Sequence, residues 1–353
     1  MDAQWLLTLY DVNQIRRQRV IYGLLKNQLT VSTAYNGMLY HQLILIGQRP
    51  WLTKQEYDQT LQQLIQAQWL TEVAKGQMKV TALGLKQQMA YWQNHYQVQH
   101  ALMFERYDVS GFRDAFLLAN QVISETSFES KSYYPLPADA MTKNWVKKWY
   151  HTNKYSDIVF QWVQQLRTYL DTLPKQDADW LTSTWIGHEV PGMTHQQLAG
   201  PASWNEEDYY WWELDQYAQL IEWALTNPHS LIGKLFVPYR RRTMSVSNLL
   251  TYQAFEQGMS VNAIQKQRRL KISTIREHLM LSAMLVPLDQ FSYDRILNAD
   301  VVAYFQTRLT QPLTQWSFNQ VKRQGTAEEF FYFRLYAIQQ FKKVEQSEGQ
   351  VNE

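Results

Sequence analysis

The stretch SNLLTYQAFEQGMSVNAIQKQRRLKISTIREHLMLSAMLVP, residues 247–287, decides the fold of the C-terminal part of the chain. Its apolar residues recur at helical spacing in three short runs, and Gly258 separates the first run from the second. Ser260 is placed to N-cap the second helix and Ser273 to N-cap the third, because a serine hydroxyl accepts an unpaired amide of a first helical turn. Short helices joined by a tight turn predict a helix-turn-helix.

One face of each of these helices is expected to point into a shared core. The residues predicted to form it are Leu249, Leu250, Phe255, Val261, Ile264, Ile275, Leu279 and Ser282. The opposite faces remain for binding.

Basic residues gather in and just before this stretch. From Lys234 to Arg276 there are nine basic residues and one acid, Glu256, so this window carries 9 − 1 = +8, while the whole chain carries +2. Such a stripe is expected of a phosphate-binding face. The predicted DNA-binding residues are Arg240, Arg241, Arg242, Lys266, Arg268, Arg269, Lys271, Ser273, Thr274 and Arg276.

Within that set, two roles are expected. Arg268, Arg269 and Lys271 would hold phosphates, while Ser273, Thr274 and Arg276 would face the groove from the start of the third helix. The alternative is that the stripe is the solvated surface of a three-helix unit that binds protein.

Residues 258–279, GMSVNAIQKQRRLKISTIREHL, resemble the helix-turn-helix at the C-terminus of some RecQ-family helicases. The same motif occurs in a stand-alone bacterial family whose gene commonly neighbours a RecQ-type helicase gene. The matching residues are Ser260, Val261, Ile264, Arg268, Leu270, Ser273, Thr274, Ile275, His278 and Leu279; Gln265 stands where the family has a small residue. The resemblance implies a bacterial accessory factor of a RecQ-type helicase in DNA recombination or repair.

Length and composition bound the class of protein. The chain has 353 residues, of which 45% are apolar and 19% charged, enough for two or three domains with a large core. It has no cysteine, which excludes disulfides and thiolate metal sites. No stretch resembles a signal peptide or a membrane span, so a cytoplasmic protein is expected.

Residues 1–97 are predicted to form a winged-helix-like domain. Helices are expected over Arg19–Leu25 and Val31–Ile46, and Thr53 opens a third helix with a Thr-x-x-Glu capping box. Trp69–Thr81 then alternates as a strand, turn and strand. The alternative is a helical bundle with an added hairpin. Winged helices bind DNA or protein, so this domain alone does not decide the function.

The rest of the chain is predicted to be helical. We expect a helical region over 98–176, a second trihelical unit over 177–237, the helix-turn-helix domain with C-terminal helices over 238–342, and a disordered tail over 343–353. The fold class is therefore mainly α, with an N-terminal winged helix, a helical middle region and a C-terminal helix-turn-helix.

Two helical segments of the middle region bear on binding. The basic and aromatic run at 145–155 suits single-stranded nucleic acid, or else a packed helix with a solvated basic face. The acidic helix that begins at Glu206 would repel phosphate if it were exposed, so it is predicted to be architectural or to bind protein.

No enzymatic motif stands out. The chain lacks a glycine-rich phosphate loop followed by Lys-Ser/Thr, and the spacing of His188, Glu189 and His195 fits no familiar metal site. No catalytic residue, metal, cofactor or small-molecule substrate is predicted. The expected function is non-enzymatic DNA binding, with DNA and a RecQ-type helicase as partners. The alternatives are a protein-interaction scaffold for a helicase without DNA contact, or a sequence-specific transcriptional regulator.

Overall fold

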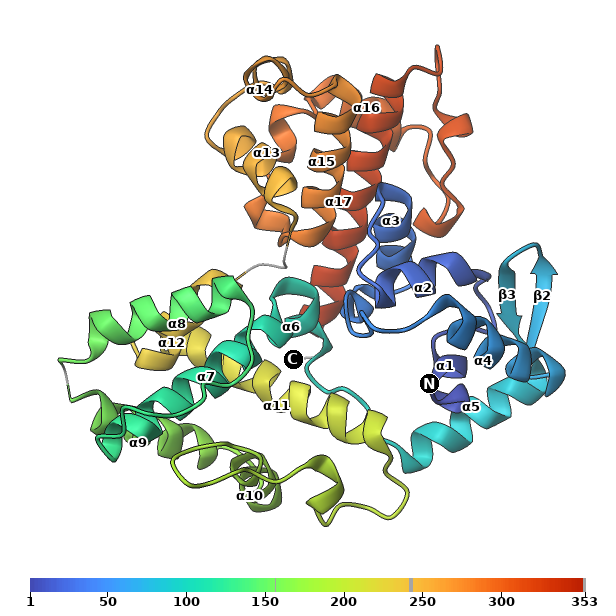
Figure 1. Cartoon of the computed structure of the whole chain (residues 1–353). Helices are drawn as coiled ribbons and strands as arrows, with labels where there is room; N and C mark the ends of the chain where they lie inside the picture. The colour runs from blue at the N-terminus through green and yellow to red at the C-terminus, as the bar shows by residue number, and fades with distance from the viewer. Residues whose placement is uncertain (156, 241–243, 352–353) are drawn as a thin grey trace. The chain divides into compact units, whose positions relative to one another are not determined.

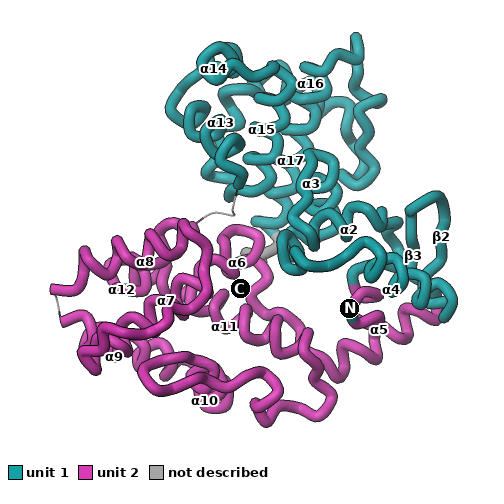
Figure 2. Tube along the Cα trace, viewed as in Figure 1, with its two compact units in different colours: residues 1, 9–81, 242–353 teal, residues 2–8, 82–241 magenta. Residues whose placement is uncertain are grey.

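The computed structural model describes residues 1–155, 157–240 and 244–351. The fold is mainly helical with one small three-stranded sheet, which confirms the predicted fold class (Figure 1). The chain divides into two compact units (Figure 2): unit 1 comprises residues 1, 9–81 and 242–353, and unit 2 comprises residues 2–8 and 82–241. The finer division predicted from the sequence, with boundaries after residues 97, 176, 237 and 342, stays a prediction.

The N-terminal part of unit 1 has the predicted order of helices followed by a hairpin. Its elements are β1 (Arg16–Arg17), α2 (Gln18–Leu25), α3 (Val31–Leu39), α4 (Lys54–Gln66), β2 (Leu70–Ala74) and β3 (Gln77–Val80). The strands form an antiparallel sheet in the order β1-β3-β2. Gly76 turns the hairpin at a φ of +70°, and the Thr53 hydroxyl accepts the Glu56 amide at 3.1 Å, so the predicted cap is confirmed.

Helix α3 is shorter than predicted. The sequence indicated a helix over Val31–Ile46, but α3 ends at Leu39. The Gln42 amide donates to the Gly37 carbonyl at 2.9 Å, and His41 adopts a φ of 53°, which closes the helix. A short 3₁₀ turn over Leu43–Leu45 follows and buries both leucines, a change of direction that apolar periodicity alone does not reveal.

The C-terminal part of unit 1 packs against its N-terminal part. Its helices are α13 (Val246–Glu256), α14 (Val261–Arg268), α15 (Ile272–Leu285), α16 (Ala299–Gln306) and α17 (Ala327–Val351). Helix α3 contacts α15, and the Arg334 guanidinium of α17 lies 3.5 Å from the centre of the Tyr35 ring of α3. The winged-helix segment and the helix-turn-helix segment therefore share one core.

Helix α17 extends into the segment that was predicted to be a disordered tail, residues 343–353. It continues to Val351, and residues 352–353 lie outside the described part of the chain. Two long-range contacts hold it there: the His41 Nδ1 and a Glu345 carboxylate oxygen are 3.1 Å apart, and the Lys342 ammonium donates to the Val286 carbonyl. Both partners are remote in sequence, which is why local composition did not predict the helix.

Unit 2 is built around one long helix. Its helices are α1 (Ala3–Thr8), α5 (Ala82–Asn94), α6 (Ala101–Arg106), α7 (Val109–Ser127), α8 (Ala140–Asn153), α9 (Ile158–Leu170), α10 (Lys175–Ser183), α11 (Glu206–Thr226) and α12 (Leu231–Leu235). Helix α11 packs against α6, α7, α10 and α12, and it buries Trp212 and Tyr217. Across the described residues, no helix is long and apolar enough to cross a membrane.

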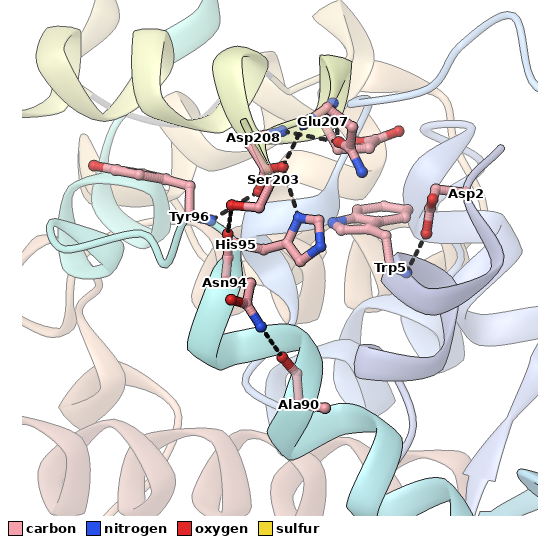
Figure 3. A network of polar contacts seen from close by, with 10 residues as sticks. Asp2, Trp5, Ala90, Asn94, His95, Tyr96, Ser203, Glu207 and Asp208 are labelled. Carbon is pink, nitrogen blue, oxygen red and sulfur yellow. Dashed lines mark hydrogen bonds and ion pairs between the residues drawn. The ribbon is translucent and has the colours of Figure 1, made fainter. Parts of the chain in front are cut away.

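The acidic residues of α11 serve this packing. The Asp208 carboxylate caps its own helix by accepting the Asn205 amide at 2.7 Å, accepts the Tyr96 amide at 2.7 Å and lies 2.8 Å from the His95 Nδ1 (Figure 3). Asp215 accepts the Tyr96 hydroxyl at 2.7 Å and is fully buried. These carboxylates hold the chain after α5 against α11, which matches the architectural one of the two predicted roles.

The basic and aromatic run on α8 is a packed helix. Trp145 and Trp149 each donate their indole N–H to a backbone carbonyl at an end of α12, at 2.9 and 3.0 Å. The side chains of Lys143, Lys147 and Lys148 are exposed. Because both indole N–H groups are committed inside the protein, the run matches the packed-helix alternative.

Candidate nucleic-acid interface

Helices α13, α14 and α15 form the predicted helix-turn-helix. Helix α13 ends before Gly258, whose φ of +101° favours glycine because a Cβ crowds that conformation in other residues. The Ser260 hydroxyl then accepts the Ala263 amide at 3.2 Å and caps α14, as predicted. A backbone reversal and a side-chain cap, only two residues apart, therefore set the angle at which α14 leaves α13.

Most of the predicted core is confirmed. Phe255, Ile264, Ile275, Leu279 and Ser282 are each at most 1% exposed. Leu249 and Val261 are half-buried. Leu250 is 49% exposed, so its placement in the core was wrong: α13 turns Thr251 and Tyr252 inward instead.

Helix α15 begins earlier than the sequence indicated. It starts at Ile272, with Lys271 at the N-cap position and no side-chain cap, so the prediction that Ser273 caps it was wrong. Ser273 lies in the first turn and is exposed. The first amides of a helix that no side chain caps are free to bind an anion, and the helix dipole favours negative charge there.

Three exposed cations lie just before or at this helix start in the chain: Lys266 in the last turn of α14, Arg269 in the turn, and Lys271 at the N-cap of α15. We call them the turn cations. Arg269 has a φ of 52°, in the left-handed region that breaks α14 and starts the turn. None of the three forms an ion pair within the described residues. Cations beside an uncapped helix start favour negative charge there.

Arg268, predicted to bind phosphate, is half-buried and turned toward α13. Its guanidinium donates to the Ser247 carbonyl, to the Ser247 hydroxyl at 3.0 Å and to the Thr251 hydroxyl. These bonds tie the end of α14 to the first turns of α13. Arg268 is therefore a clamp between two helices, and three of its five guanidinium N–H groups donate to α13.

His278 extends this clamp to α15. Its Nδ1 lies 2.8 Å from the Thr251 hydroxyl, the same group that Arg268 contacts. Burial and the positive charge of Arg268 both lower the pKa of His278 from its ordinary value. These effects favour the neutral imidazole, and His278 joins the packing of the three helices.

Arg276, predicted to face the groove, pairs with α17. Its guanidinium lies 3.3 Å from a Glu328 carboxylate oxygen and stacks over Phe331 at 5.8 Å. The side chain is only 18% exposed. Arg276 therefore joins α15 to the start of α17.

Four predicted residues remain: Arg240, Arg241, Arg242 and Thr274. Arg240 is exposed but follows a 3₁₀ turn of unit 2, whereas the helix-turn-helix belongs to unit 1. Arg241 and Arg242 lie outside the described residues. Thr274 is half-buried beside the exposed Ser273.

Glu277 is an exposed residue that the sequence analysis missed. It lies four residues after Ser273 on α15, so the two side chains share one face of the helix. A carboxylate on a helix in the major groove accepts a hydrogen bond from the N4 amino group of cytosine. Counting along the helix from Ser273 would have identified it.

The net charge differs between the units. Unit 1 holds 21 Lys and Arg against 14 Asp and Glu, so 21 − 14 = +7, and unit 2 holds 13 against 18, so 13 − 18 = −5. The turn cations thus belong to the basic unit.

Comparison with known proteins agrees with this geometry. Residues 247–337 match the family model described as a helix-turn-helix domain. The chain therefore contains a helix-turn-helix domain near its C-terminus, a class of domain whose presence suggests DNA binding. The chain is also similar to Protein YpbB of Bacillus subtilis (strain 168), with 23% identity over 359 residues that cover 95% of each protein. No solved structure matches.

Proposed function

We propose that this chain is a non-enzymatic DNA-binding protein that inserts the start of α15 into the major groove. The observation that carries the proposal is the group of turn cations beside the uncapped N-terminus of α15, inside the matched helix-turn-helix domain. In this arrangement Lys266, Arg269 and Lys271 contact phosphates and fix the register of the helix. Ser273 and Glu277 then face the bases.

A binding assay with the full chain tests this function. Fluorescence anisotropy with duplex, single-stranded and forked DNA at several salt concentrations should show binding that weakens steeply as salt rises, because phosphate contacts release counterions. The absence of binding to all three forms would refute the proposal and leave a scaffold that does not touch DNA. A large preference for one duplex sequence would instead indicate a transcriptional regulator.

We also propose that the protein works with a RecQ-type helicase in DNA recombination or repair. The support is the resemblance of residues 258–279 to the motif of such helicases. We assign the helicase contact to unit 2, because its net charge of −5 disfavours DNA. A pull-down of a RecQ-type helicase by the full chain tests this partnership, and a variant without the turn cations should retain the helicase. If neither the full chain nor the variant captured the helicase, the proposed partnership would be contradicted.

A further inference from the structure

A second group of cations lies outside the helix-turn-helix motif. Arg308, just after α16, and Arg323, in the loop before α17, both stack on the ring of Tyr304, with 3.9 and 3.7 Å between guanidinium carbon and ring centre. Lys322 precedes Arg323, and all three basic side chains are exposed. We call Arg308, Lys322 and Arg323 the loop cations.

The ring holds the two arginines in place. The Tyr304 hydroxyl donates to the Val321 carbonyl at 2.9 Å, which fixes the ring against the loop. The Arg308 Nη1 donates to the Tyr304 carbonyl at 3.4 Å and to the Thr307 hydroxyl at 3.2 Å, which leaves its Nη2 side for an anion. A guanidinium stacked on a ring presents N–H groups that match phosphate oxygens. Because stacking has already restricted these side chains, an anion that binds them loses less conformational entropy than it would on free arginines.

Side-chain contacts of α17 connect this loop to α15. Glu328, in the first turn of α17, pairs with Arg276 of α15 at 3.3 Å. The next residue, Glu329, accepts the backbone amides of Arg323 and Gly325 at 3.1 and 3.0 Å. The first turn of α17 therefore joins the loop to α15, and Figure 1 shows α14 and α16 at one end of the unit.

Two acidic residues near the loop cations, Glu329 and Asp300, interact with the backbone at helix starts. Glu329 is turned to the loop amides, as described. Asp300 lies in the first turn of α16, where the helix dipole stabilises a carboxylate. Across the described residues, Arg308 and Lys322 have no ion-pair partner. The charge of Arg323 interacts with that of Glu329, so the excess positive charge of the loop cations lies on Arg308 and Lys322.

We propose that Arg308, Lys322 and Arg323 form a second phosphate-binding site for the backbone of the nucleic acid that α15 engages. The inference rests on the proposed DNA-binding function and extends its footprint from the turn of the helix-turn-helix to the loop before α17. The ligand class is the phosphodiester backbone of DNA, contacted without regard to base sequence.

Charge-removing and charge-retaining variants of the full chain test the site. Arg308→Gln with Arg323→Gln should lower the slope of log affinity against log salt on duplex DNA by up to about 0.9 per lost phosphate contact. Arg308→Lys with Arg323→Lys should keep most of the slope, because lysine keeps the positive charge. Lys322→Gln alone, at an exposed position with no ion-pair partner in the described chain, covers the case in which the arginine variants fail to fold.

The outcomes separate this inference from the function on which it rests. A lower slope in the glutamine variants, with thermal unfolding unchanged, supports the site. A wild-type slope in folded glutamine variants overturns it, even though DNA binding itself stands. Wild-type protein that binds no DNA overturns the function and the site together.

Discussion

Two adjacent arginines, Arg268 and Arg269, are expected to respond in opposite ways to the same substitution. Arg268→Ala removes three hydrogen bonds from a charged guanidinium to α13, whereas Arg269→Ala removes an exposed side chain. Hydrogen bonds to a charged group contribute about 1.5–3 kcal/mol, and this half-exposed clamp is expected to lose roughly that much in total. The exposed site should change the free energy of unfolding by less than about 0.5 kcal/mol.

Urea denaturation and DNA binding of the two variants measure this contrast. Position 269 has a positive φ, which strains alanine no more than arginine. The Arg269→Ala substitution therefore adds no backbone strain. Arg268→Ala should lower the urea midpoint and leave the salt slope of DNA binding unchanged while the protein stays folded. Arg269→Ala should leave the midpoint unchanged and lower the slope by up to about 0.9. The reverse pattern would refute the assignment of Arg268 as a clamp.

Three further predictions concern the cores of the two units. Leu279→Ala, at a fully buried position of α15, should cost roughly 2–5 kcal/mol in urea denaturation, whereas Leu250→Ala, at a half-exposed one, should cost much less; equal losses would mean that the helix faces are misassigned. The pKa of His278 in the folded state lies below 6.5, so its contribution to the free energy of unfolding should be complete above pH 6.5 and be lost as pH falls through the folded pKa. If the free energy of unfolding of His278→Gln depended on pH as that of the wild type does, this prediction would be contradicted. Asp215→Ala should destabilise the protein by roughly 3–5 kcal/mol in thermal unfolding, because the Tyr96 hydroxyl and two backbone amides lose their acceptor; a loss below 1 kcal/mol would contradict that role.

Local signals in the sequence predicted the local structure well. Gly258, the cap at Ser260 and the Thr53 hydroxyl cap each act within about four residues, and each is confirmed. The other half of the predicted capping box at Thr53 was wrong, because the Glu56 carboxylate pairs with the amino terminus of Met1 at 3.0 Å. The hairpin over Trp69–Thr81 also follows from alternation and a turn residue. In these cases the residues that determine the structure are neighbours in the chain.

The roles of charged side chains depended on partners that the sequence does not place. Arg268 and Arg269 are equally basic, but only the first reaches Ser247, which lies 21 residues earlier. Arg276 is held by Glu328, 52 residues later. The same limit explains why α3 was not predicted to pack on α15, since that contact joins opposite ends of the chain.

The central claim is that the turn cations form the DNA-binding surface. The variant Lys266→Gln, Arg269→Gln and Lys271→Gln removes three charges from that surface. The matched control, Lys143→Gln, Lys147→Gln and Lys148→Gln, removes three charges from exposed lysines of α8 in unit 2. Each variant loses three positive charges, so the two have equal net charge and differ in the surface from which the charge is removed.

Salt-titrated anisotropy on one duplex compares wild type and these two variants most directly. The account predicts that the turn variant weakens binding and lowers the salt slope by up to about 2.7, at 0.9 for each of three phosphate contacts, while the α8 variant binds like wild type. A wild-type slope in the folded turn variant, or a loss of binding confined to the α8 variant, would contradict it.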